Sequence, residues 1–219
     1  MKTKKAIYFL LMFLPLLITV FALPFLPESV PAHYNFAGEI DRWGSKYETL
    51  LFPLCTIGMG VFMLWMAKIA AKSEEGGKNN EKIVFYTGMG ISVWFTVLHC
   101  YFLYKDFAAA KSMSYAYEAD VNQLCCIFLG LIMVITGNFM PKLRNNGVMG
   151  LRTPWSMKND TTWKKSQIFG RISFMISGAL IVAFGIFLDG YFAMCVALGI
   201  IIICTVVCII YTYKIAQKY

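Results

Sequence analysis

The chain has 219 residues, of which 58% are hydrophobic, 16% are aromatic and only 15% are charged. Soluble domains carry about 25% charged residues, and here the apolar residues form long uninterrupted blocks, which excludes a soluble domain and predicts an integral membrane protein. The net charge of +8 would suit nucleic acid or anionic lipid, but the placement of the positive residues predicts membrane orientation instead, with no direct nucleic-acid partner.

Six apolar blocks are candidates to cross a bilayer as α-helices, at roughly 20 residues per span. They cover residues 6–26, 50–71, 83–104, 120–140, 172–188 and 191–213. The first block follows a short basic start and resembles a signal peptide, but its length favours a span. We therefore predict an all-α fold, a polytopic membrane helical bundle with six transmembrane helices in a single membrane domain, residues 1–219.

Charge in the polar segments predicts the orientation of this bundle. Sixteen of the 20 Lys and Arg residues lie in the termini and in the second and fourth connections, which six spans place on one side. Positive residues concentrate in cytoplasmic segments. Both termini and residues 141–171, hereafter the signature loop, are therefore predicted to be cytoplasmic, and residues 27–48 are predicted to form an extracellular loop.

The extracellular loop contains the run Pro31-Ala-His-Tyr-Asn-Phe-Ala-Gly-Glu-Ile-Asp-Arg-Trp-Gly-Ser-Lys46. Its glycines suit turns, and the residues before Gly38 suit a short extended arm that residues 41–43 follow back. One interpretation is a compact cap with Trp43 anchored at the membrane interface. The other is a binding surface for a ligand arriving from outside, with candidate residues His33, Asn35, Gly38, Asp41, Trp43 and Gly44.

Residues that carry metal or catalytic chemistry are sparse. The seven cysteines lie in apolar blocks without a Cys-x-x-Cys motif, and the two histidines, His33 and His99, have no clustered carboxylate or thiol. We therefore predict no metal site and no cofactor. No carboxylate pair or nucleophile beside a base is present, so no enzyme is predicted. No span offers an ionisable group at mid-depth, which weakens an ion-transport hypothesis.

The signature loop is the longest polar interruption of the chain and holds its most specific run, Asn146-Gly-Val-Met-Gly-Leu-Arg-Thr-Pro-Trp-Ser156. Arg152 offers a planar fork of donors suited to carboxylate or phosphate, although juxtamembrane arginines also bind lipid head groups. Residues 159–161 suit the cap of a helix on which Trp163, Gln167 and Arg171 share a face. The candidate binding residues are Asn146, Gly150, Arg152, Thr153, Pro154, Trp155, Trp163 and Arg171.

These residues resemble a known family. The run from Asn146 to Ser156, followed by Trp163 and Arg171, is similar to the signature of the SdpI family of bacterial immunity membrane proteins. The extracellular run is similar to a domain of unknown function that commonly precedes that signature. Together the two resemblances cover most of the chain, and this chain has Gln167 where the family often has a histidine.

The resemblance implies a multi-pass protein of the bacterial plasma membrane that protects the producing cell against a secreted antimicrobial peptide toxin. It also implies signalling, in which the toxin-loaded protein holds a cytoplasmic transcriptional repressor at the membrane. The implied partners are the peptide toxin, the repressor and membrane lipids. The alternative from the residues themselves is a small-molecule or lipid-handling membrane transporter that uses Arg152 on anionic head groups.

Overall fold

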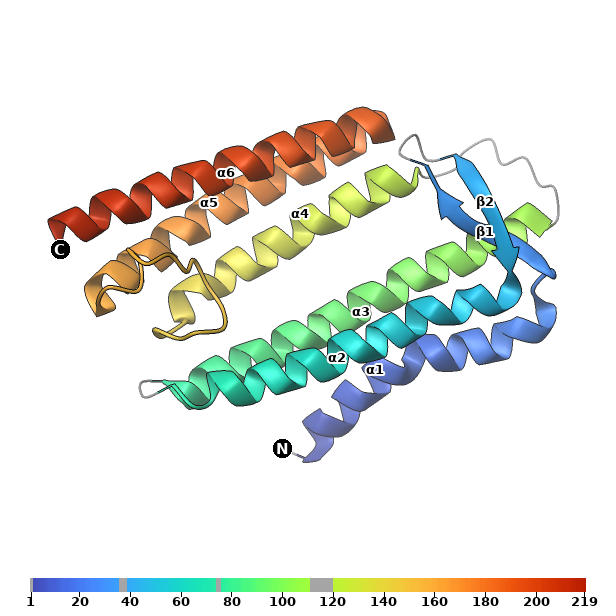
Figure 1. Ribbon diagram of the computed structural model, residues 1–219, viewed down its shortest axis with the longest axis horizontal. Helices are drawn as coiled ribbons and strands as arrows, with labels where there is room; N and C mark the ends of the chain where they lie inside the picture. Colours follow the sequence, from blue (N-terminus) through green and yellow to red (C-terminus); the bar gives the residue numbers. More distant parts are fainter. Residues whose placement is uncertain (1, 36–38, 74–75, 111–119) are drawn as a thin grey trace. The chain divides into compact units, whose positions relative to one another are not determined.

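The computed structural model describes residues 2–35, 39–73, 76–110 and 120–219 (Figure 1). The described part of the chain contains six helices long and apolar enough to cross a membrane. They are α1 (Lys2–Ala22), α2 (Leu51–Ala70), α3 (Gly77–Ala110), α4 (Val121–Phe139), α5 (Asp160–Phe187) and α6 (Gly190–Lys218). The prediction of an all-α polytopic membrane protein is confirmed, and the cytoplasmic placement of the termini stays a prediction.

The chain divides into two compact units. The first comprises Met1–Trp65 and Phe85–Glu118, and the second comprises Met66–Val84 and Ala119–Tyr219. The division passes through α2 and α3, so the end of α2 and the start of α3 belong to the second unit. Each unit is described separately.

In the first unit, neutral hydrogen bonds join α1 to α2 and α3. The Tyr8 hydroxyl donates to the Gly60 carbonyl at 2.9 Å. The Thr19 hydroxyl donates to the Pro15 carbonyl at 2.8 Å and lies 2.6 Å from His99 Nε2. His99 is 1% exposed and stacks on Phe52. Buried polar groups need such partners, so His99 is a packed residue of the helix bundle.

Two short strands extend the first unit beyond the all-α prediction. Strands β1 (Ser29–Tyr34) and β2 (Ile40–Ser45) pair in an antiparallel ribbon, with Ser29 opposite Ser45 and Tyr34 opposite Ile40. The expected extended arm and its return are thus present. A 3-10 helix, η2 (Lys46–Leu50), begins with Ser45 as its cap and leads into α2.

In the second unit, α4, α5 and α6 run side by side (Figure 1). Glycines permit the closest helix approach, because a Cβ on Gly130 would lie 2.5 Å from the Gly178 carbonyl oxygen, and a Cβ on Gly178 would lie equally close to the Gly130 carbonyl oxygen. Small residues allow helix backbones to meet in this way in membranes. A 3-10 helix, η3 (Met140–Lys142), ends α4 and starts the signature loop.

Candidate functional site

The buried amide of Asn146 organises the beginning of the signature loop. Its Oδ1 accepts hydrogen bonds from the backbone N–H groups of Val148 and Met149, both at 2.8 Å. Its Nδ2 donates to the carbonyls of Arg144, at 2.7 Å, and Met149, at 3.2 Å. With only 4% of its surface exposed, Asn146 holds the turn of the loop and leaves no amide atom for a ligand.

A second buried amide, that of Gln167 on α5, closes the middle of the loop. Its Oε1 accepts from the Leu151 N–H and its Nε2 donates to the Leu151 carbonyl, both at 3.0 Å. Gly150 adopts φ +111, and a Cβ there would lie 2.7 Å from Gln167 Oε1. Glycine is therefore required at position 150 both by its backbone conformation and by the closeness of Gln167.

Hydroxyl groups fix the turn that follows. The Ser156 Oγ accepts from the Thr153 N–H at 2.8 Å, and the Thr153 Oγ1 accepts from the Ser156 N–H at 3.0 Å. Asn159 then caps α5 by accepting from the Thr162 N–H, while the Thr162 hydroxyl oxygen accepts from the Asn159 N–H. This reciprocal capping box is why α5 starts at Asp160.

Trp163 fixes the signature loop within the second unit. The indole is 3% exposed, its Nε1 donates to the Leu143 carbonyl at 2.9 Å, and it packs with Ile83 of α3 and with Leu143. Nearby, Asn80 of α3 accepts from the Arg144 N–H at 3.0 Å. The first turns of α3 thus support the loop from one side and α5 from the other.

Among the predicted binding residues that precede α5, the exposed ones are Arg152, Pro154 and Trp155. Trp155 is 36% exposed and meets the Tyr213 ring edge-on at 5.3 Å. Within the described part of the chain, Arg152 forms no hydrogen bond and no ion pair. The guanidinium group of Arg152, which is permanently charged and has five N–H donors, is therefore unpaired. Buried hydrogen bonds hold the backbone that carries it.

The predicted site residues of the signature loop therefore fall into two groups. Asn146, Gly150, Thr153 and Trp163 build the loop, whereas Arg152, Pro154, Trp155 and Arg171 face outward. The predicted shared face of Trp163, Gln167 and Arg171 is only partly present, since Arg171 is exposed. The reason is helix geometry, because each step of four residues turns the face by about 40°.

Three residues that organise the loop were not among the predicted site residues. Gln167 was placed on one helix face with Trp163 without a role, and its position one turn after Trp163 was the available signal. Thr162 carried the signal of a capping position three residues after Asn159. Asn80 carried none, because it lies 64 residues from its partner Arg144 in sequence.

A hydrogen bond joins two of the predicted binding residues of the ribbon, and ion pairs lie beside them. His33 Nδ1 lies 2.6 Å from an Asp41 oxygen, and Arg42 lies 2.9 Å from Glu48. The hydrogen bond to Glu48 and the charge of that carboxylate raise the pKa of Arg42 above its usual value. Lys46 also forms an ion pair, with Glu28 at 2.8 Å.

The remaining ribbon residues divide between exposed and supporting positions. Trp43 is 53% exposed. The Asn35 side chain donates to Glu39 at 3.0 Å. A Cβ on Gly44 would collide with the Glu48 carboxylate, so the absence of a side chain at this position lets the ribbon pack on η2. Gly38 lies outside the described residues. Among the residues described, no three His, Cys, Asp or Glu side chains gather to hold a metal ion.

Six long apolar helices with a structured polar loop between the fourth and fifth define a multi-pass α-helical membrane protein. Residues 142–212 match the model of the SdpI/YfhL protein family, and residues 10–57 match a domain of unknown function, DUF1648. These matches confirm the resemblance to the SdpI family seen in the sequence.

A nearly full-length relative supports this resemblance. The chain is 21% identical over 215 residues to the Immunity protein SdpI of Bacillus subtilis (strain 168), a match that covers 98% of this chain and 97% of that protein. No solved structure matches the chain. The relative and the six candidate spans together identify a multi-pass bacterial membrane protein.

Proposed function

We propose that this protein is an immunity protein that protects its own cell from a secreted peptide toxin without catalysing a reaction. The observation that carries the proposal is the match to an immunity protein along nearly the whole of both chains. The two matched regions include the ribbon with the start of α2 and the signature loop with most of α5 and α6. Both regions expose polar side chains, His33 in the ribbon and Arg152 in the signature loop among them.

The two regions suit different partners. The ribbon carries the exposed Trp43, and tryptophan is enriched where proteins bind partners. The signature loop presents Arg152 and Trp155 on a rigid backbone, which keeps the entropy lost on binding low. We assign the peptide toxin to the extracellular ribbon and a cytoplasmic partner, such as a repressor held at the membrane, to Arg152, Pro154 and Trp155.

A survival assay tests the proposal. The chain is expressed in a strain sensitive to a secreted peptide encoded beside its gene, and survival is measured over a range of peptide concentrations. Protection supports the immunity function, whereas unchanged survival at normal membrane levels contradicts it. Altered uptake of a small solute or lipid without protection would favour the transporter alternative.

Variants of Arg152 separate a defined contact from diffuse charge. Lysine keeps the charge of arginine but loses its bidentate geometry. We expect Arg152→Lys to lose most of the protection measured in the survival assay, nearly as much as Arg152→Ala, while inserting normally into the membrane. The matched control is Lys214→Ala, an exposed cation of α6. Wild-type behaviour of Arg152→Lys would show that Arg152 supplies only charge.

A further inference from the structure

A buried carboxyl group, that of Asp106, lies near the end of α3 in the first unit. The helix continues to Ala110, and Asp106 is only 5% exposed. Within the described residues its carboxyl group forms no hydrogen bond and no ion pair. A carboxylate buried without a partner is costly, and so is a buried neutral acid whose O–H has no acceptor. The group therefore suits a ligand that brings positive charge together with hydrogen-bond donors.

His99, seven residues earlier, offers a second acceptor on the same helix. The Thr19 hydroxyl donates its hydrogen to the Pro15 carbonyl, so its 2.6 Å contact with His99 places a hydrogen on Nε2 of the imidazole. The other ring nitrogen, Nδ1, then carries a lone pair, and it is buried without a hydrogen-bond partner among the described residues. Seven residues make almost two helical turns, so His99 and Asp106 share one side of α3, about 10.5 Å apart along its axis.

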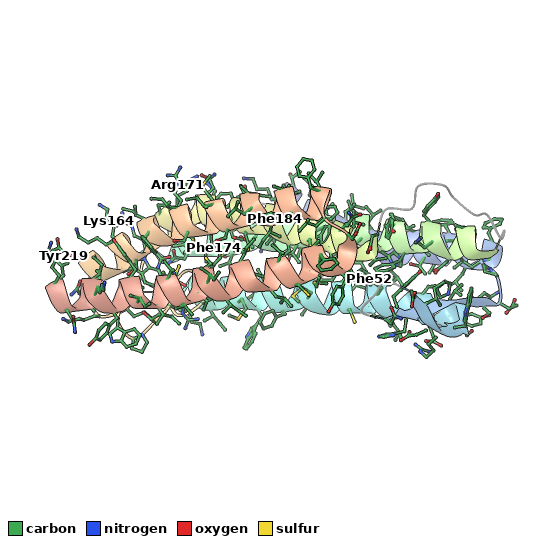
Figure 2. All side chains as sticks on the ribbon, turned by 90° about the horizontal axis from the view of Figure 1, so that it is seen from above. Phe52, Lys164, Arg171, Phe174, Phe184 and Tyr219 are labelled. Carbon is green, nitrogen blue, oxygen red and sulfur yellow. The ribbon has the colours of Figure 1, made fainter. Side chains whose placement is uncertain are left out.

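Aromatic rings lie between these two acceptors. Phe102, one turn before Asp106, has its ring centre 5.9 Å from that of Phe52. Phe52, labelled in Figure 2, belongs to the first turn of α2 and also stacks on the ring of His99. On its other side Phe102 meets Tyr34 of β1, with 6.2 Å between ring centres. Helical side chains lean toward the N-terminus of their helix, so we expect the carboxyl group of Asp106 to extend toward the Phe102 ring.

We propose that these groups form a binding site for a primary ammonium group on an alkyl chain. A carboxylate, a ring-nitrogen lone pair and aromatic faces all attract positively charged hydrogen. The ammonium donates to Asp106 and lies against the Phe102 ring, because aromatic faces attract cations most strongly away from water. The alkyl chain packs on the rings toward His99, whose Nδ1 accepts from any further donor of the ligand. A quaternary ammonium has no N–H for the carboxylate.

The test uses the purified full chain in a neutral detergent, with n-butylammonium as the probe and calorimetric titration as the measurement. We expect saturable binding of one ammonium per chain, and no binding of n-butanol or tetramethylammonium at the same concentrations. Asp106→Asn keeps the size of the side chain and should weaken binding at least about tenfold. Phe102→Leu, which removes the ring face, should weaken it about fivefold.

The matched control is Asp160→Asn, which removes an exposed carboxylate at the start of α5 and should leave the affinity unchanged. A loss in this variant as large as in Asp106→Asn would overturn the proposal in favour of diffuse attraction. Unchanged affinity in Asp106→Asn, or equal binding of n-butanol, would also overturn it.

Competition against the bound probe then distinguishes two sources of the ammonium group. Displacement by N-acetyl-lysine amide, but not by phosphatidylethanolamine, would assign the site to a lysine side chain of a peptide. Displacement by phosphatidylethanolamine, but not by phosphatidylcholine, would assign it to a lipid head group. Either result supports the ammonium site, and neither depends on the immunity function.

Discussion

The signature loop and the β1–β2 ribbon are both polar segments between helices, but different forces hold them. The loop depends on buried neutral groups, among them Asn146, Gln167 and Trp163, which hydrogen-bond to backbone atoms. The ribbon is held by the backbone pairing of its two strands, and its side chains form exposed ion pairs such as Arg42 with Glu48. Unmaking a buried hydrogen bond costs far more than losing an exposed ion pair. We therefore expect the loop to be rigid and the ribbon to be able to change conformation when a ligand binds.

The sharpest test of this comparison concerns the side of the membrane on which each region lies. Ser29→Cys in the ribbon and Met157→Cys in the loop place thiols at exposed positions. With an impermeant maleimide on intact cells we expect labelling of the first and none of the second, because positive residues mark the loop as cytoplasmic. The control is labelling of both after permeabilisation, and the reverse pattern in intact cells would refute the assigned orientation.

Within the loop, Gln167→Leu should have the largest effect on stability. Leucine fills a similar space but leaves the N–H and carbonyl of Leu151 without their partner, at a cost of about 2 to 4 kcal/mol. The measurement is the thermal midpoint of the purified protein together with protease cleavage of the loop. Gln217→Leu, the same change at an exposed position of α6, is the matched control. Equal behaviour of the two variants would show that Gln167 does not hold the loop.

Gly150→Ala should have a smaller effect on the same measurements. The φ of +111 strains any residue with a Cβ, and that Cβ would press on Gln167, so we expect a destabilisation of about 1 to 3 kcal/mol. Gly147→Ala is the control, since a Cβ there meets no atom within 4 Å. An unchanged midpoint for Gly150→Ala would mean that the loop is looser than its hydrogen bonds indicate.

The smallest effect is expected in the ribbon. Arg42→Gln removes the ion pair to Glu48, but an exposed pair contributes little and is screened by salt. We expect no measurable change in the thermal midpoint, at low or at high ionic strength. A marked loss of stability, especially one reproduced in wild type by high salt, would place the ribbon among the rigid parts of the molecule and remove the contrast with the loop.

The sequence by itself determined the membrane fold and showed the resemblance to a family. Long apolar blocks with few charges have no stable alternative to spanning helices in a bilayer, because every backbone polar group must be paired within the membrane. The glycines and prolines of the polar segments indicated where the chain turns, and the run around Arg152 carried the family signature.

Only the tertiary structure separated the residues that build the signature loop from those that face outward. Asn146 and Arg152 are both polar residues of one short run. Asn146 bonds to backbone groups within three residues, but the run alone does not show that the first side chain is buried and the second exposed. The difference arises from partners distant in sequence. Gln167 holds Leu151 across 16 residues, and Asn80 holds Arg144 across 64. Burial is decided by which elements pack together, and periodicity within one segment does not record that choice.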